Sequence, residues 1–172
     1  MTTTTSLLVI GAGPYALSTA AFARQHGIDT VIVGRPMGFW RDHMPAGMCL
    51  RSGPDWRLDA AAVHTLEAYL EERAIAPADV DPLPIGLFLD YAEWFRRAKG
   101  IEVREALVAD LAKPDGQFVA VLDSGARVAA DAVVAAPGIC HFTNLPAWAG
   151  SRRVRAAGRR RDGHRTFQPT SG

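Results

Sequence analysis

The chain has few of the features that mark secreted, membrane-spanning or metal-binding proteins. Only two cysteines, Cys49 and Cys140, occur in 172 residues. They lack the spacing of a metal site, so free thiols in a reducing compartment are expected, with a redox pair as the alternative. No apolar run approaches the roughly 20 residues that cross a membrane, and the N-terminal MTTTTS has no basic leader. We therefore expect a cytoplasmic protein without a metal or a membrane partner.

Negative charge is scarce in the last part of the chain. Residues 1–150 carry 12 Lys/Arg and 17 Asp/Glu, a net charge of −5, whereas residues 151–172 carry seven Arg and one Asp, a net charge of +6. We predict one domain over residues 1–150 and a disordered Arg-rich tail over residues 151–172. The tail is either a basic arm for nucleic acid or an acidic surface, or the product of a frame shift in a GC-rich gene. We prefer the frame shift, so nucleic acid is not an expected partner.

What the chain does have is a strand, a glycine-rich turn and a helix near its N-terminus. Leu7–Ile10 is an apolar run that suits a parallel strand covered on both faces. Gly11 and Gly13 let the backbone turn tightly and approach a pyrophosphate, and Ala16 provides the small residue that helix-to-strand packing requires. The helix, which ends at His26-Gly27, offers free N–H groups and a positive dipole to an anion. The segment predicts a dinucleotide site; the alternative is a tight connection without a ligand.

The second β-run, residues 28–34, ends without the acidic residue that binds a ribose about 20 residues beyond the glycines. Gly34 and Arg35 stand there instead. An arginine at this place can hold the 2′-phosphate of NADP; equally, Arg35 is a surface residue after a strand. The missing acid weakens the expected ribose contact and leaves the expected pyrophosphate site intact.

Residues 36–56 are predicted to form an irregular loop rich in Met, Trp and Arg. Phe39 and Trp40 either cover a flat ring system or pin the loop to the core. Arg41 or Arg51 could meet a phosphate or a substrate charge. For His43 we expect a solvent-facing or locally hydrogen-bonded ring rather than a catalytic one.

The rest of the chain predicts two helices followed by strands. The helices are residues 60–74 and 87–98, and the second should bury one face. A brief strand at 101–103 precedes three β-runs that resemble an antiparallel meander. The run 132–136 resembles a further buried parallel strand beside the first. The residues expected in the core of these helices are Phe88, Tyr91, Ala92 and Phe95, with His64 and Trp94.

Taken together, these patterns resemble the FAD-binding part of the flavoproteins with two dinucleotide-binding domains. This group includes the flavin-containing monooxygenases and the lysine and ornithine N-hydroxylases. GAGPYA matches its first fingerprint, GFWRDHMPAGM its tryptophan-containing loop, LPIGLFLDYAEWF the helix before its third strand, and DAVVAAPG its second fingerprint. The resemblance runs from about Leu7 to Trp148. Two departures are Gly34, in place of the ribose-binding acid, and the ending Ala136-Pro137-Gly138, in place of Ala-Thr-Gly.

The resemblance implies an α/β fold: a Rossmann-like parallel sheet with flanking helices and a three-stranded antiparallel β-meander, of the FAD/NAD(P)-binding type. It implies FAD as the cofactor, with Trp40 near the flavin, Val108 contacting adenine through its backbone, and Gly138 passing close to the cofactor. In the group, NADPH reduces the flavin, which then activates oxygen. No catalytic side chain is identified. The residues implied to hold the pyrophosphate are Gly11, Gly13, Pro14, Tyr15 and Ala16.

Members of the group also contain a second Rossmann domain for NADPH, and this sequence has no second glycine fingerprint of that kind. We therefore expect a C-terminally truncated FAD-binding portion of an NAD(P)H-dependent flavoprotein oxidoreductase or monooxygenase, inactive alone. Three alternatives stay open: a non-catalytic nucleotide-binding module that works with a separate subunit, a small NADP-dependent reductase favoured by Arg35, and an interaction protein acting through its tail. The sequence indicates neither the substrate nor the oligomeric state.

Overall fold

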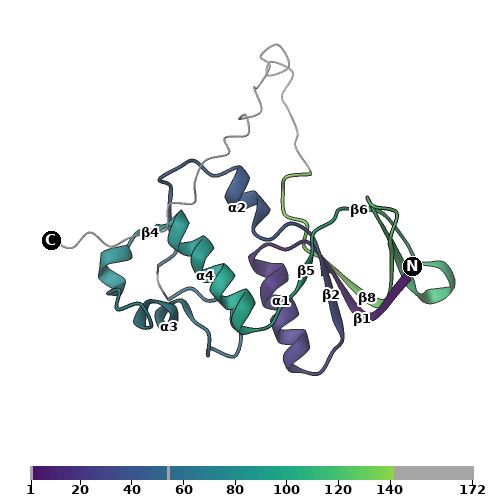
Figure 1. The fold of residues 1–172 in the computed structure, drawn as a ribbon, viewed down its shortest axis with the longest axis horizontal. Helices are drawn as coiled ribbons and strands as arrows, with labels where there is room; N and C mark the ends of the chain where they lie inside the picture. The colour runs from purple at the N-terminus through teal and green to yellow at the C-terminus, as the bar shows by residue number, and fades with distance from the viewer. Residues whose placement is uncertain (1, 54, 142–172) are drawn as a thin grey trace, which may run out of the picture.

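The computed structural model describes residues 2–53 and 55–141 (Figure 1). Its main sheet has six strands in the order β5-β2-β1-β8-β7-β6. These strands are β1 (Thr2–Ile10), β2 (Thr30–Val33), β5 (Val103–Arg104), β6 (Val108–Ala112), β7 (Phe118–Leu122) and β8 (Arg127–Ala135). The helices are α1 (Pro14–Gln25), α2 (Gly38–Asp42), α3 (Leu66–Glu71) and α4 (Ile85–Ala98), and two short strands, β3 (Cys49–Leu50) and β4 (Leu83–Pro84), pair with each other.

The sheet joins a parallel half to an antiparallel meander. Strands β5, β2, β1 and β8 run parallel, and β6, β7 and β8 pair antiparallel. This confirms the predicted fold class. Helix α1 contacts β1 and β2, whereas α2, α3 and α4 form a helical part beside the sheet (Figure 1).

Strand β8 replaces two strands that the sequence predicted separately. Its residues 127–130 pair with β7 on one side and with Thr2–Thr5 of β1 on the other, and its residues 132–135 continue along β1 as far as Ile10. One long strand therefore closes the meander and also completes the parallel half. The prediction of a buried run over 132–136 was wrong, because Ala132 and Ala135 are exposed. Among the described strands, β7 reaches only the first half of β8.

The connections before α4 also correct the sequence predictions. Residues 36–56 are not irregular throughout, since α2 and β3 lie within them. The predicted helix 60–74 is only α3, because the carboxylate of Asp59 accepts backbone N–H bonds from Ala61, Val63 and His64 and holds a turn there. Thr65 then begins the helix by accepting the Ala68 N–H at 3.1 Å, a typical N-cap.

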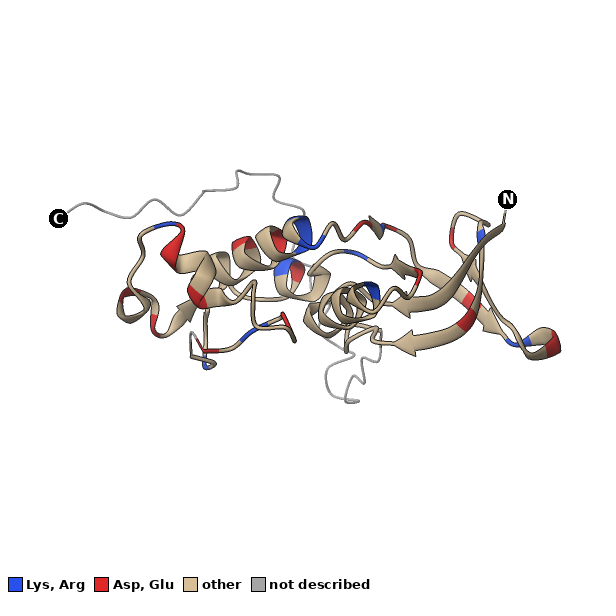
Figure 2. Ribbon diagram, turned by 90° about the horizontal axis from the view of Figure 1, so that it is seen from below, with Lys and Arg blue, Asp and Glu red and all other residues tan. Residues whose placement is uncertain are grey.

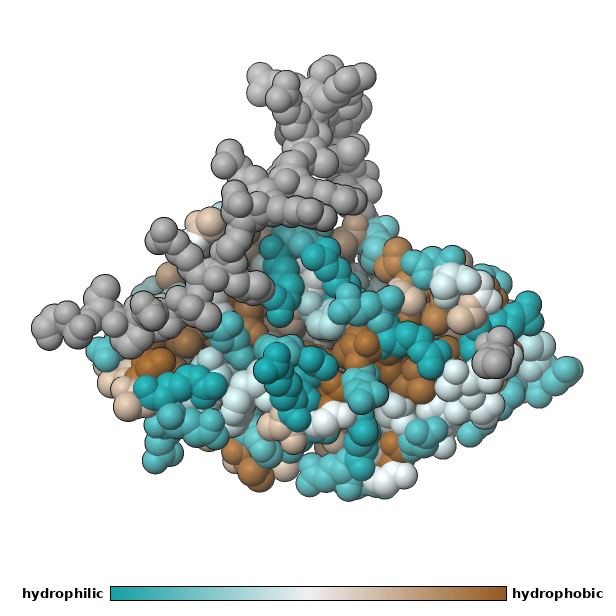
Figure 3. Space-filling model, viewed as in Figure 1, coloured by the Kyte–Doolittle hydropathy of each residue, from teal (hydrophilic) through white to brown (hydrophobic). Residues whose placement is uncertain are grey.

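Two apolar clusters hold the molecule together. The larger lies between α1, the parallel strands and α4, and the smaller is formed by side chains of β1, β2, β7 and β8 around Leu8 and Val128. The four predicted core residues of α4 are buried, whereas His64 and Trp94 are half-buried. Acidic and basic residues are interspersed over the ribbon (Figure 2), and hydrophilic and hydrophobic residues are mixed over the face in Figure 3. No described helix is long and apolar enough to cross a membrane.

Candidate functional site

The carboxyl ends of β1, β2 and β8 meet at the glycine turn, Gly11–Gly13. Gly11 has a φ of +114°, and a Cβ added to it would lie 2.0 Å from the carbonyl oxygen of Ala136. Backbone hydrogen bonds join the three strand ends, from the Gly11 N–H to the Val33 carbonyl at 2.8 Å and from the Ala136 N–H to the Ile10 carbonyl at 2.7 Å. The two glycine-containing segments that the sequence singled out are therefore packed directly against each other.

Gly13 has a different environment from Gly11. Its φ is −81°, and a Cβ at this position would meet nothing within 4 Å. It begins α1, which has no side-chain cap and no acidic residue in its first turn. The first N–H groups of a helix lack partners within the helix, and here no side chain caps them. This end of α1 therefore has the donors and the dipole that bind an anion.

The neighbours of Gly13 suit the same purpose. Pro14 occupies the first helical position, where the missing N–H costs nothing. Ala16 is fully buried and allows α1 to pack closely, as expected. Tyr15 is 83 % exposed at this end of the helix, so it is accessible to a ligand.

The end of β2 contains no carboxylate of its own. Gly34 has a φ of +155°, and a Cβ there would lie 2.9 Å from both the Ala12 nitrogen and the Gly11 carbonyl carbon. The next residue, Arg35, is 61 % exposed and forms an ion pair with Asp42 at the end of α2. The structure thus places a guanidinium and a carboxylate together beyond the end of β2.

Of the other residues predicted to contact the cofactor, Gly138 lies beside the glycine turn and Val108 lies in the meander. Gly138 follows Ala136 closely, has a φ of +71° and faces open space, so it belongs to the same edge as the glycine turn. Val108 begins β6 opposite Leu122 and packs against the smaller apolar cluster. In the sheet, β8 and β7 separate β6 from β1, the strand that leads into the turn.

The tryptophan-containing segment is pinned to the core. Trp40 is half-buried and meets the ring of Phe88 edge-on at 5.1 Å. Met37, just before α2, is buried and donates its N–H to the Ala12 carbonyl at 2.9 Å, so α2 begins against the glycine turn. Of the two interpretations of this loop, the structure shows the packing role and leaves a role near a ring system as a proposal.

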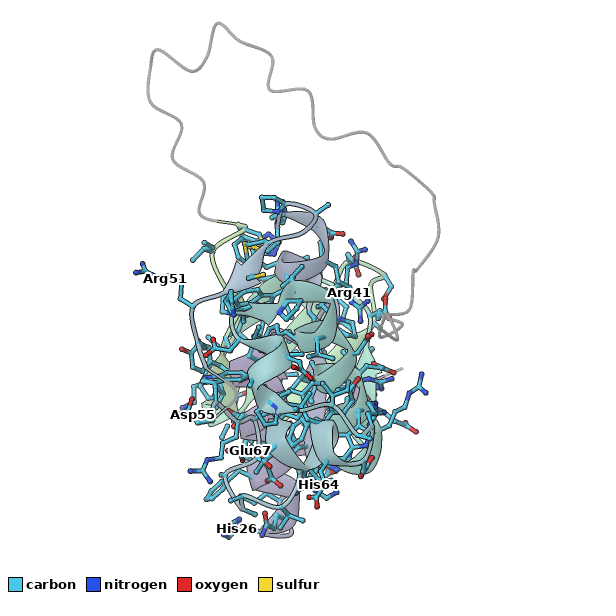
Figure 4. All side chains as sticks on the ribbon, turned by 90° about the vertical axis from the view of Figure 1, so that its left-hand side faces the viewer. His26, Arg41, Arg51, Asp55, His64 and Glu67 are labelled. Atoms are coloured by element: carbon cyan, nitrogen blue, oxygen red, sulfur yellow. The ribbon has the colours of Figure 1, made fainter. Side chains whose placement is uncertain are left out.

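The polar residues of this segment are less confined. His43 is exposed, as expected of a solvent-facing ring, and stacks on Phe39 at 5.6 Å. Arg41 donates from Nε to the Pro36 carbonyl at 3.2 Å. Arg51 projects outward on the left of Figure 4, on the opposite side from Arg41.

A buried polar cluster around Asp59 was not predicted from the sequence. Asp59 is 2 % exposed and its carboxylate receives the Lys99 ammonium at 2.8 Å. Burial alone would raise the pKa of Asp59, but Lys99 and the backbone N–H groups of His64 and Ala61 hold that pKa well below its usual range. Burial raises the pKa of Tyr91 to about 12, and its hydroxyl donates to the His64 carbonyl at 2.9 Å. The 40-residue separation of Asp59 and Lys99 gives no sequence pattern.

An open hollow of about 660 Å³ lies between α3 and α4. Tyr69, Leu87 and Trp94 give it an apolar floor, and Glu93 and Arg97 stand at its rim. The hydrogen bonds from Arg96 lower the pKa of Glu93 to about 2. None of the residues that line this hollow belongs to the glycine turn. The contacts of Lys99 and Tyr91 with the Asp59 cluster fasten α4 to the turn before α3.

Comparison with known proteins gives the fold a context. No protein-family model and no curated protein matches the sequence. A flavin monooxygenase from Stenotrophomonas maltophilia superposes with a TM-score of 0.60 and 22 % identity over 77 % of this chain and 38 % of its own. The lysine monooxygenase NbtG from Nocardia farcinica superposes with a TM-score of 0.59 and 20 % identity over 76 % of this chain and 42 % of its own. OTEMO in complex with FAD and NADP superposes with a TM-score of 0.58 and 18 % identity over 83 % of this chain and 27 % of its own.

The chain has the fold of the FAD/NAD(P)-binding flavoproteins. The resemblance seen in the sequence is confirmed at the level of the fold. The chain spans less than half the length of each of these three flavoproteins. The predicted domain end at residue 150 and the Arg-rich tail lie outside the described residues.

Proposed function

We propose that this chain binds FAD at the glycine turn and is the FAD-binding portion of an NAD(P)H-dependent flavoprotein oxidoreductase of the monooxygenase type, located in the cytoplasm. The observation that carries the proposal is the uncapped start of α1, where a Cβ on Gly13 would meet nothing, beside the close contact of Gly11 with Ala136. The fold agrees, since one matched structure is a complex with FAD and NADP. In this proposal residues 1–150 form the cofactor domain.

The residues present fit a dinucleotide. The pyrophosphate would lie over Gly13, where no side chain intervenes, and accept N–H bonds from the first turn of α1, at Tyr15 and Ala16, where the helix dipole is favourable. Pro14 would contact it without donating a hydrogen bond, because proline has no N–H. Gly138 would pass beside it, because it shares this edge through Ala136.

The roles of the remaining predicted residues follow from their places. Trp40 would hold α2 against α4 through Phe88 and present its edge toward the flavin. The backbone of Val108 would contact adenine. FAD supplies hydride and electron transfer when it is bound, whereas the protein contributes binding and orientation.

Gly13→Ala provides a sharp test of the proposal. Its φ is ordinary and its added methyl group meets no protein atom within 4 Å, so the fold should be unaffected. The methyl group would nevertheless occupy the space assigned to the pyrophosphate. Gly86→Ala, in α4, is the matched control because its methyl group also meets nothing.

The measurement is the visible absorption spectrum after incubation with FAD and desalting. We expect flavin bands to remain on the wild type and on Gly86→Ala, and to be at least about tenfold weaker on Gly13→Ala. A colourless wild type would contradict FAD binding. Equal flavin on Gly13→Ala and on the wild type would show that the pyrophosphate lies elsewhere.

A second candidate function is a small NADP-dependent reductase. The observation that favours it is Arg35, an exposed cation at the end of β2, where NADP-binding proteins hold the 2′-phosphate. Titration with NADPH in the absence of flavin, on the wild type and on Arg35→Ala, separates this candidate from FAD binding. The reductase candidate requires that the wild type binds NADPH tightly without flavin and that Arg35→Ala loses this binding.

A further inference from the structure

Position 34 is the place where a Rossmann fold commonly presents a ribose-binding acid. This chain cannot present one there, because any side chain at Gly34 would collide with the backbone at Gly11 and Ala12. The clash is between the Cβ atom itself and main-chain atoms, so a rotation of the side chain would not relieve it. If a carboxylate serves the ribose, it must come from another element.

The neighbouring residue brings such a carboxylate to this place. Arg35 directly follows Gly34, and its guanidinium forms an ion pair with Oδ2 of Asp42. Gly38 lies between them on α2, and a Cβ at that position would come within 3.3 to 3.4 Å of the aliphatic carbons of Arg35. The absence of a side chain at Gly38 therefore lets Arg35 lie along α2 and reach its last residue.

Asp42 retains the capacity to bind a ligand. Its side chain is 38 % exposed, and Oδ1 has no hydrogen-bond partner among residues 2–53 and 55–141. A carboxylate accepts hydrogen bonds at both oxygens, and those from hydroxyl donors to an ionised acceptor are comparatively strong. Helix α2 also starts against the glycine turn through the bond from Met37 to Ala12.

We propose that Asp42, held by Arg35, is the carboxylate that binds the ribose hydroxyls of the dinucleotide, in place of the acid missing at the end of β2. This inference rests on the proposed function, since it assigns the adenosine end of the same site. Asp42 is the binding residue and Arg35 is a positioning residue. The ion pair also disfavours a 2′-phosphate, because that group would face the charge of Asp42 and compete with it for Arg35.

The test is calorimetric titration of the full 172-residue chain with three nucleotides: ADP, 2′,3′-dideoxy-ADP, which lacks both hydroxyls, and 2′,5′-ADP, which carries the 2′-phosphate. The quantity of interest is the ratio of the dissociation constants of dideoxy-ADP and ADP. The wild type should bind ADP about tenfold more tightly than dideoxy-ADP, and Asp42→Asn should reduce the ratio to near one. A purely structural defect would weaken both nucleotides and leave the ratio unchanged.

Two further variants complete the design. Asp110→Asn, on the exposed outer strand β6, is the matched control and should keep the wild-type ratio. Arg35→Ala should lower the ratio, because Asp42 loses the group that holds it, and Arg35→Lys should restore part of it. An unchanged ratio in Asp42→Asn, or tighter binding of 2′,5′-ADP than of ADP, would overturn the assignment. A wild type that binds neither ADP nor FAD would instead contradict the proposed function itself.

Discussion

Three glycines at the site have three different physical roles. Gly11 makes room for the carbonyl of Ala136, Gly34 makes room for the turn itself, and Gly13 has no protein neighbour to avoid. Gly11 and Gly34 are required by the packing of the protein backbone. The absence of a side chain at Gly13 serves no contact within the described chain, which is the reason to assign it to a ligand.

Gly11→Ala should therefore destabilise the protein, unlike Gly13→Ala. The added methyl group would overlap the Ala136 carbonyl and the φ of +114° is unfavourable for alanine, so we expect a loss of about 3 kcal/mol in the free energy of unfolding. Urea denaturation followed by circular dichroism measures it. Comparable midpoints for the two variants would contradict this division of roles.

The tight geometry of the turn could be predicted because its spacing is local, whereas the ion pairs of Asp42 and Asp59 could not. Gly11, Gly13 and Ala16 lie within one strand–turn–helix unit, so their relative positions follow from the chain itself. Asp42 is paired because Arg35 folds back along Gly38, and Asp59 is paired because Lys99 lies beside it in space. Such pairings depend on tertiary contacts that no periodicity reveals.

At the scale of the elements, β1, β2, α1, α4 and the meander follow from hydrophobic pattern and turn residues. The errors occur where one element serves two neighbours or where a side chain interrupts a helix. Strand β8 pairs with both β1 and β7, and the backbone N–H groups around Asp59 bond its carboxylate rather than carbonyls of a helix. Competition between local propensity and a specific tertiary contact explains both differences.

The Asp59–Lys99 ion pair should contribute more to stability than an exposed pair of similar length. Lys99→Met leaves a buried carboxylate with only its backbone donors, so we expect a loss of about 3 kcal/mol. Arg97→Met breaks the 2.7 Å contact with Glu93 in an exposed setting, and should cost less than about 1 kcal/mol. Equal shifts of the urea midpoint would argue against a role of burial.

At the scale of the whole molecule, the sheet with α1 and the helical part are each held together by contacts of a different character. Helix α1 is held on the sheet by apolar packing, whereas the turn before α3 is held to α4 by the buried ion pair and the hydroxyl of Tyr91. Apolar packing is insensitive to pH, but ion pairs are not. Acid should therefore weaken the helical part before it weakens the sheet.

This difference gives a pH dependence with a defined sign. The pKa of Glu93 falls from 4.5 to about 2 on folding, and the pKa of Asp59 also falls. A carboxyl whose pKa is lowered by folding stabilises the folded state above its unfolded pKa, and this contribution disappears as the pH falls through the folded value. Stability should therefore be constant near neutral pH and decline from about pH 4.5 toward pH 2.

Urea titrations at pH 7, 4, 3 and 2.5 would measure this decline, and Glu93→Gln isolates one part of it. Glutamine cannot titrate, so the variant should be less stable than the wild type at pH 7 and should lose less stability on acidification. The two curves should converge toward pH 2, where the wild-type carboxyl also becomes neutral. Parallel curves across this range would mean that the bonds from Arg96 and Arg97 do not stabilise the charged form of Glu93. In that case the acid sensitivity of the helical part would have to come from Asp59, whose contribution Lys99→Met reports in the same titration.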